Sequence, residues 1–89
     1  MSKDDIFGEI VDLFKRKSNL DWKALRCDEK PMRFYGVDSL VLIKIVSGLE
    51  ERFGVRIRDE EMVETGNFAK LVSLVESKLE LSGADNLAR

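Results

Sequence analysis

The 89-residue sequence contains no histidine and one cysteine, Cys27. A single cysteine excludes a disulfide within the chain, and the absence of histidine removes the commonest general base and metal ligand. A Ser-His-Asp triad, a Cys-His pair and a cysteine-rich zinc site are therefore impossible within this chain. The neighbouring Arg26 would favour the thiolate of Cys27, but a lone cysteine outside any motif is best interpreted as an incidental thiol.

Long apolar runs and a surplus of basic charge are also missing. No segment approaches the roughly 18 apolar residues of a membrane span, and no apolar signal-peptide core follows the polar start. The formal net charge is −2, and basic residues are interspersed with acidic ones from Lys3 to Arg89 without forming a stripe. We therefore expect a cytoplasmic protein with neither membrane nor nucleic acid as partner. A helix-turn-helix nucleic-acid binder would fit the helices expected below but not this charge.

The composition, with 44% hydrophobic and 36% charged residues and one proline, is that of a folded protein. Its length suits one small domain with one modest core. We predict this domain over residues 1–81 and a flexible, small and polar tail over residues 82–89. The Met1 start and the absence of flanking domains favour a free-standing subunit, expected to be a monomer.

Three segments have apolar residues at spacings of three and four, which predicts three amphipathic helices. The first covers residues 4–17. The second covers residues 39–53, is apolar nearly all round at its start, and has Gly54 placed to end it. The last begins after Asn67, its expected cap, and continues to about Leu79.

Gly48 lies inside the second of these helices. A glycine there costs about 1 kcal/mol relative to alanine. We interpret it as a point where another helix approaches closely.

The remaining segments are less regular. Residues 18–37 predict a long ordered loop whose apolar residues lie over the helices. Those residues are Leu20, Trp22, Leu25, Met32, Phe34 and Tyr35. Asp59 is expected to cap a short helix that ends near Thr65, and a lone strand at Ile57 is the competing interpretation. The sequence thus predicts an all-α fold, a small antiparallel four-helix bundle with three longer helices, one short helix and a long first loop.

The segment Gly36-Val37-Asp38-Ser39-Leu40 places the hydroxyl of Ser39 at a helix start. Unpaired backbone N–H groups and the helix dipole favour an anion there, so a phosphodiester on this serine would be well placed. The chemistry would then belong to the attached group. The alternative is that Asp38 or Ser39 serves only as a helix cap.

With these features the chain resembles the acyl and peptidyl carrier proteins, small helical bundles whose serine is loaded with phosphopantetheine. The resemblance rests on Gly36-Val37-Asp38-Ser39-Leu40, on the helix ending Leu49-Glu50-Glu51-Arg52-Phe53-Gly54-Val55, on the acidic Asp59-Glu60-Glu61 turn and on the segment from Thr65 to Leu79. It implies that Ser39 receives phosphopantetheine from coenzyme A. It also implies that Asp38 helps to orient the transferase's metal-bound coenzyme A, and that Leu40 anchors the helix start in the core.

The resemblance further implies a non-catalytic carrier whose arm holds acyl or aminoacyl groups as thioesters. Its partners would be a phosphopantetheinyl transferase, a loading enzyme, and downstream synthase or tailoring enzymes. Fatty-acid carriers have carboxylates soon after the serine, whereas this chain has the apolar and then basic run Val41-Leu42-Ile43-Lys44. That run is more similar to carriers of polyketide, nonribosomal peptide or mixed specialised pathways.

Partner docking is expected on Val41, Leu42, Lys44 and Ile45, unless the apolar members belong to the core. A fatty-acid synthesis carrier stays as one alternative. A carrier-like interaction module that is never modified is the other.

Overall fold

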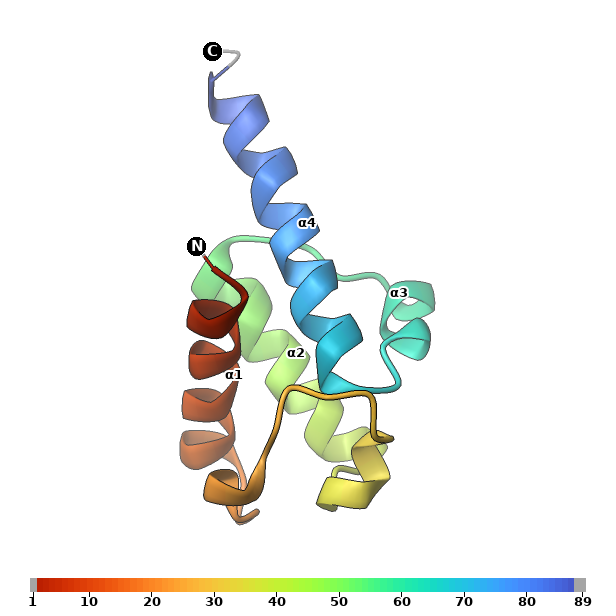
Figure 1. Cartoon of the computed structure of the whole chain (residues 1–89). Helices are drawn as coiled ribbons and strands as arrows, with labels where there is room; N and C mark the ends of the chain where they lie inside the picture. Colours follow the sequence, from red (N-terminus) through yellow and green to blue (C-terminus); the bar gives the residue numbers. More distant parts are fainter. Residues whose placement is uncertain (1, 88–89) are drawn as a thin grey trace.

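A computed structural model describes the backbone of residues 2–87 and the side chains of residues 2–81. Its elements are α1 (Lys3–Lys17), η1 (Trp22–Ala24), η2 (Met32–Tyr35), α2 (Ser39–Phe53), α3 (Asp59–Glu64) and α4 (Phe68–Leu87), where η denotes a 3₁₀ turn. α1 runs opposite to α2 and α4, and the short α3 lies beside the start of α4 (Figure 1). The predicted all-α four-helix fold is confirmed, and residues 2–87 contain no strand at Ile57 or elsewhere.

Several helix ends follow the sequence signals. Gly54 ends α2 in the left-handed conformation, with φ of 65°. The Lys70 N–H donates to Asn67 Oδ1 at 2.8 Å, which confirms Asn67 as the cap of α4. α1 begins at Lys3 because Ser2 accepts a hydrogen bond from the Asp5 N–H at 3.1 Å.

Two predicted helix ends are wrong. Asp59 is the first residue of α3 and not its cap; Arg58 holds the cap position, and its N–H donates to Glu61 Oε1 at 3.0 Å. A glutamate at the third helical position can reach back in this way. α4 does not end near Leu79 but continues to Leu87, since no proline interrupts it and extending an existing helix costs little. Flexibility of residues 82–89 stays a prediction; residues 88 and 89 lie outside the described residues.

The core lies where α1, α2 and α4 face one another. Its aromatic centre is Phe68 of α4, which meets Phe14 of α1 edge to face with ring centroids 5.6 Å apart. The buried apolar residues are Ile6, Ile10, Leu13, Phe14, Leu25, Met32, Val37, Ile45, Val46, Leu49, Ile57, Phe68, Leu71, Val72 and Val75. Within residues 2–87 no helix is both long and apolar enough to cross a membrane.

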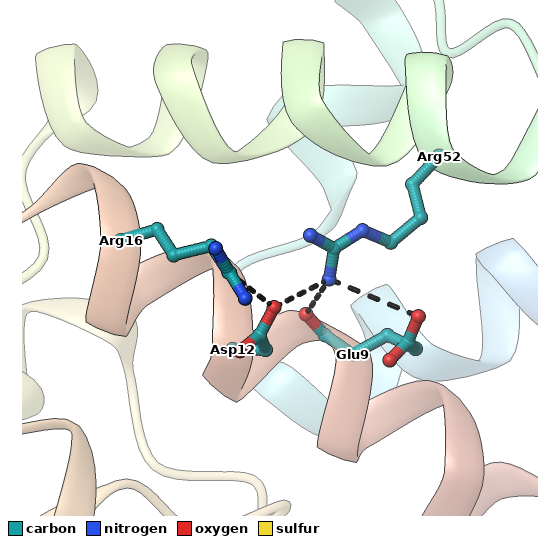
Figure 2. A network of polar contacts seen from close by, with 4 residues as sticks. All are labelled: Glu9, Asp12, Arg16 and Arg52. Carbon is teal, nitrogen blue, oxygen red and sulfur yellow. Dashed lines mark hydrogen bonds and ion pairs between the residues drawn. The ribbon is translucent and has the colours of Figure 1, made fainter.

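A polar network on the surface joins α1 to α2 (Figure 2). Arg52 Nη1 of α2 donates to Asp12 Oδ2 at 3.0 Å and to the Glu9 carbonyl at 3.3 Å. Arg16 reaches the same Asp12 oxygen at 2.8 Å, so two guanidinium groups share one carboxylate. The hydrogen bonds from Arg16 and Arg52 hold the pKa of Asp12 below its ordinary value. Arg52 thus links the two helices on their solvent side.

The first loop is ordered, as predicted, and crosses from α1 to the start of α2. It is hydrogen-bonded to the α3–α4 turn and to the first turn of α4: the Met32 N–H donates to the Gly66 carbonyl at 3.0 Å, and the Ala69 N–H donates to the Asp28 carbonyl at 3.1 Å. The Tyr35 hydroxyl also donates to Asp28 Oδ2. One predicted anchor is wrong, because the Phe34 side chain is 63% exposed.

Candidate functional site

Ser39 is the first residue of α2, and its side chain is exposed. The residue before it caps the helix, since the Val41 N–H donates to Asp38 Oδ1 at 2.9 Å. Within the described residues no hydrogen bond involves the Ser39 hydroxyl. The alternative between Asp38 and Ser39 as cap is thereby decided for Asp38. The hydroxyl of Ser39 remains available at a helix N-terminus.

The chain reaches Ser39 through a tight turn at Gly36. This glycine has φ of 81°, a conformation that other residues adopt only at a cost, and its N–H donates to the Arg33 carbonyl at 3.0 Å. Val37 then enters the core, with 5% of its surface exposed. The buried Val37 and the capping Asp38 together fix the position of Ser39 at the surface of the bundle.

The position of Leu40 contradicts the sequence prediction. It does not anchor the start of α2 in the core, because 71% of its side chain is exposed. Ile45 is fully buried, and at 3.6 residues per turn Leu40 lies about 140° around the helix from it. Ile43, one turn along on the same side as Leu40, is 51% exposed. The exposed apolar side of α2 therefore begins next to Ser39.

The predicted docking residues divide between surface and core. Ile45 cannot contact a partner, since none of its surface is exposed. Val41 and Leu42 are half-buried, and Lys44 is exposed. The sequence interpretation missed Leu40, Ile43 and Val63 as exposed apolar residues near the site. The angular positions of Leu40 and Ile43 around the helix axis, measured from the buried Ile45 and Leu49, would have identified both as exposed.

An apolar hollow of about 240 Å³ lies between α2 and α3, and Ser39 is on its wall. The rest of the wall is Met32, Leu42, Ile43, Met62, Val63, Thr65 and Gly66. Apart from the two hydroxyls of Ser39 and Thr65, no side chain here is polar. An apolar group tethered at Ser39 would thus find an apolar surface within one helix turn of its attachment point.

Cys27 is exposed and lies in the first loop, away from this constellation in sequence. Loss of hydration raises the pKa of its thiol, and the charges of Asp28 and Asp4 act in the same direction against the weaker effect of Lys3. The suggestion that a basic neighbour favours the thiolate is therefore wrong. Nothing in the geometry gives this cysteine a chemical role.

Comparison with known proteins identifies the family. Residues 9–75 match the family described as "Phosphopantetheine attachment site". The chain belongs to this family. Phosphopantetheine, covalently attached, is accordingly its cofactor. An exposed serine at the start of a 15-residue helix, with its neighbour already serving as cap, fits such a phosphodiester.

Similar sequences within this carrier family are acyl carrier proteins. The acyl carrier protein of Thermotoga maritima is 28% identical over 78 residues, which cover 88% of this chain and 96% of the relative. An acyl carrier protein homolog of Mycoplasma genitalium is 34% identical over 86 residues, covering 93% of this chain and 99% of the relative. The predicted relationship to carrier proteins is confirmed.

Solved carrier structures share the fold. The crystal structure of the Thermotoga maritima acyl carrier protein superposes with a TM-score of 0.81 at 28% identity, covering 90% of this chain and 93% of the other. A solution structure of the hexanoyl acyl carrier protein from the actinorhodin polyketide synthase of Streptomyces coelicolor gives 0.70 at 25% identity, covering 90% and 92%. The arrangement in Figure 1 is therefore that of a carrier bundle.

Proposed function

We propose that Ser39 is the attachment residue and that the chain works as a non-catalytic carrier of acyl or aminoacyl groups in the cytoplasm. The observation that carries this proposal is the exposed hydroxyl at the start of α2, which has no capping role and borders the apolar hollow. When attached, the arm supplies a terminal thiol on which a cargo is held as a thioester.

The residues around Ser39 have separate tasks in this proposal. The N–H groups of the first turn of α2 and the dipole of its 15 residues favour the phosphodiester. Asp38 keeps the helix start in place through its bond to the Val41 N–H, and we propose that it also helps to orient coenzyme A on a transferase. Leu40, being exposed, offers an apolar contact to that enzyme.

Loading by a transferase tests the attachment site. We expect incubation with coenzyme A and a broad-specificity phosphopantetheinyl transferase to add the mass of one phosphopantetheine group to the wild-type chain and nothing to Ser39→Ala. Ser47→Ala, which changes another exposed serine of the same helix, is the matched control and should load fully. If several active transferases load neither the wild type nor the control, the chain is an unmodified interaction module.

We also propose that the pathway is a polyketide, nonribosomal peptide or mixed specialised one. Supporting this, residues 39–49 contain no carboxylate, and Lys44 is their single charge. Fatty-acid carriers, by the resemblance described above, place carboxylates in this region. Such carboxylates would meet basic patches on synthase enzymes, and this chain cannot make that contact through the first turns of α2.

The cargo distinguishes the pathways. Mass spectrometry of the protein recovered from its native cells should find an aminoacyl or functionalised acyl group on the peptide that contains Ser39. A homologous series of saturated straight chains would instead indicate fatty-acid synthesis. The Ser39→Ala protein expressed in the same cells controls for adducts formed elsewhere on the chain.

A further inference from the structure

The neighbours Asp38 and Ser39 face two different hollows at the start of α2. Ser39 borders the apolar hollow toward α3, whereas Asp38 borders one of about 520 Å³ toward the end of α1. Three basic residues line this second hollow, namely Arg16, Lys17 and Lys44, and Asp38 is its single carboxylate. The attachment serine is thus flanked by an apolar side and a basic side.

The basic side has two cations free to meet a partner. Arg16 is paired with Asp12, which it shares with Arg52 (Figure 2), so part of its charge is compensated. Lys17 and Lys44 are exposed and have no ion pair among residues 2–81. The Asp38 carboxylate accepts a hydrogen bond from the Val41 N–H but keeps its negative charge. The two lysines outnumber this single carboxylate, so the face is positively charged.

Packing of its stem against α2 helps to hold Lys17 beside Lys44. A Cβ placed on Gly48 would lie 3.2 Å from Lys17 Cε, so the lysine stem runs over the bare backbone of this glycine. The two lysines also line a further hollow of about 410 Å³ with Ile43 and Ser47. The ammonium groups of two helices are thereby gathered on one side of α2.

The apolar side supplies the other half of a docking surface. Leu40, Ile43 and Val63 are 71%, 51% and 82% exposed. Ile43 lines both the apolar hollow and the hollow with Lys17 and Lys44, so it stands between the two sides. Large exposed apolar side chains beside a functional group mark interaction sites. Apolar residues at the centre and charges at the rim are the usual composition of a transient interface.

We infer that the enzymes acting on Ser39 dock with an apolar patch over Leu40 and Ile43 and with carboxylates against Lys17 and Lys44. The partner's docking surface is accordingly acidic next to its apolar patch. This inference rests on the proposed function, because it assumes that enzymes act on Ser39. Opposite charge in the partner accelerates encounter, and the gain falls as salt is added.

The test uses the phosphopantetheinyl transferase of the native cells, the first enzyme that must reach Ser39. We expect Lys44→Glu to lower kcat/KM for loading about tenfold at low ionic strength, through KM and not kcat. Lys17→Gln should give a smaller loss of the same kind. The kcat/KM of the wild type should fall as NaCl is added, and that of Lys44→Glu should change much less. The dissociation constant of the transferase for the Ser39→Ala chain and its Lys44→Glu derivative gives a readout independent of loading.

The matched control is Lys70→Glu, the same charge reversal at an exposed lysine on α4. It should leave loading within about twofold of the wild type. An equal loss in Lys70→Glu would mean that net charge and not this surface matters, and would overturn the inference. Unchanged or faster loading of Lys44→Glu would do the same while leaving the carrier function intact.

Two further outcomes separate the inference from its basis. If the wild-type chain is not loaded by any active transferase, the proposed function and the docking surface fall together. If Lys44→Glu leaves loading unchanged but abolishes sedimentation with phosphatidylglycerol vesicles, the surface meets a membrane and not an enzyme. Thermal melting of each variant checks that the bundle is intact. Because the altered side chains are exposed, the melting temperatures should stay close to that of the wild type.

Discussion

Gly48 of α2 lies directly against Leu13 of α1, so that a Cβ placed on Gly48 would come within 2.9 Å of Leu13 Cδ2. Leu13 is buried, with 3% of its surface exposed, and has little room to move aside. The predicted close approach of another helix at Gly48 is confirmed. Contact at this glycine sets how closely α1 and α2 pack, and with it the position of the Lys17 stem beside α2.

Gly48→Ala should destabilise the fold by about 1 kcal/mol. Overpacking costs typically about 1–3 kcal/mol, which the better helix propensity of alanine, about 1 kcal/mol, offsets only in part. Urea unfolding measures the difference. In a Leu13→Ala background the same substitution should become stabilising, because the obstructing methyl is gone.

The control for Gly48 is Gly8, an exposed glycine inside α1 at which an added Cβ would have no neighbour within 4 Å. Gly8→Ala should therefore stabilise the protein by about 0.5–1 kcal/mol. A loss of stability at both glycines would contradict the steric explanation and indicate a general effect of the added methyl group.

Loading and folding should separate at the start of α2. Asp38→Ala removes the bond to the Val41 N–H and should cost about 1 kcal/mol, whereas Ser39→Ala should change the unfolding free energy by less than about 0.5 kcal/mol. Chemical denaturation of the unloaded proteins checks both values. A larger loss in Ser39→Ala than in Asp38→Ala would reverse the assignment of the cap.

Leu40 and Ile45 should respond in opposite ways to truncation. Leu40→Ser exposes no core and should alter stability by less than about 0.5 kcal/mol, while slowing modification of Ser39 through loss of an apolar contact. Ile45→Ala empties a fully buried position and should cost about 2–5 kcal/mol. Melting temperatures and transferase kinetics of the two variants give the comparison.

Low pH should weaken the contact between α3 and α4 that Glu61 makes with Lys78. Its carboxylate accepts from the Arg58 N–H and pairs with Lys78 at 3.0 Å, which lowers the pKa of Glu61 from 4.5 to about 2. Since the pKa is depressed in the folded state, the stabilisation is complete above pH 4.5 and is lost as the pH falls toward 2.

Glu61→Gln should consequently be less stable than the wild type at neutral pH, and the difference should shrink between pH 4.5 and pH 2. Unfolding by urea at several pH values measures it. Glu64→Gln, an exposed position of the same helix, serves as control and should follow the wild-type profile. A constant difference between Glu61→Gln and the wild type over this range would argue against the ion pair as the cause.

The link between α1 and α2 in Figure 2 should be sensitive to salt. Arg52→Gln removes two hydrogen bonds across the helices, so the urea midpoint should fall at low ionic strength and the loss should diminish as NaCl is added. Arg16→Gln breaks a pair within one helix and should cost less. A larger loss in the urea midpoint for Arg16→Gln than for Arg52→Gln would contradict the role of Arg52 in linking the two helices.

The bounds of α2 could be predicted because three signals agree there. The apolar period, the polar cap ahead of it and Gly54 after it all indicate residues 39–53, as observed. At α3 the signals conflict, because Asp59 is a good cap by type while Glu61 can reach back to the preceding N–H. Only the three-dimensional course of the chain decides whether Asp59 caps the helix or Glu61 accepts the hydrogen bond at its start.

Burial on α2 was harder to predict than helicity. Nearly every residue from Leu40 to Val46 is apolar, so the period alone cannot say which side faces the core. The side of α2 that is buried depends chiefly on its packing against α1, whose residues are distant in sequence. For the same reason no sequence pattern indicates that Lys17 and Lys44, which are 27 positions apart, share a hollow.

The first loop, which leads to Ser39, is held by backbone hydrogen bonds to Gly66 and Ala69 and has little freedom to move. If Ser39 carries the arm as proposed, the cargo reaches a partner enzyme through rotation about the bonds of the arm and not through movement of its attachment residue. Each partner enzyme would then meet the attachment residue in the same orientation relative to the bundle.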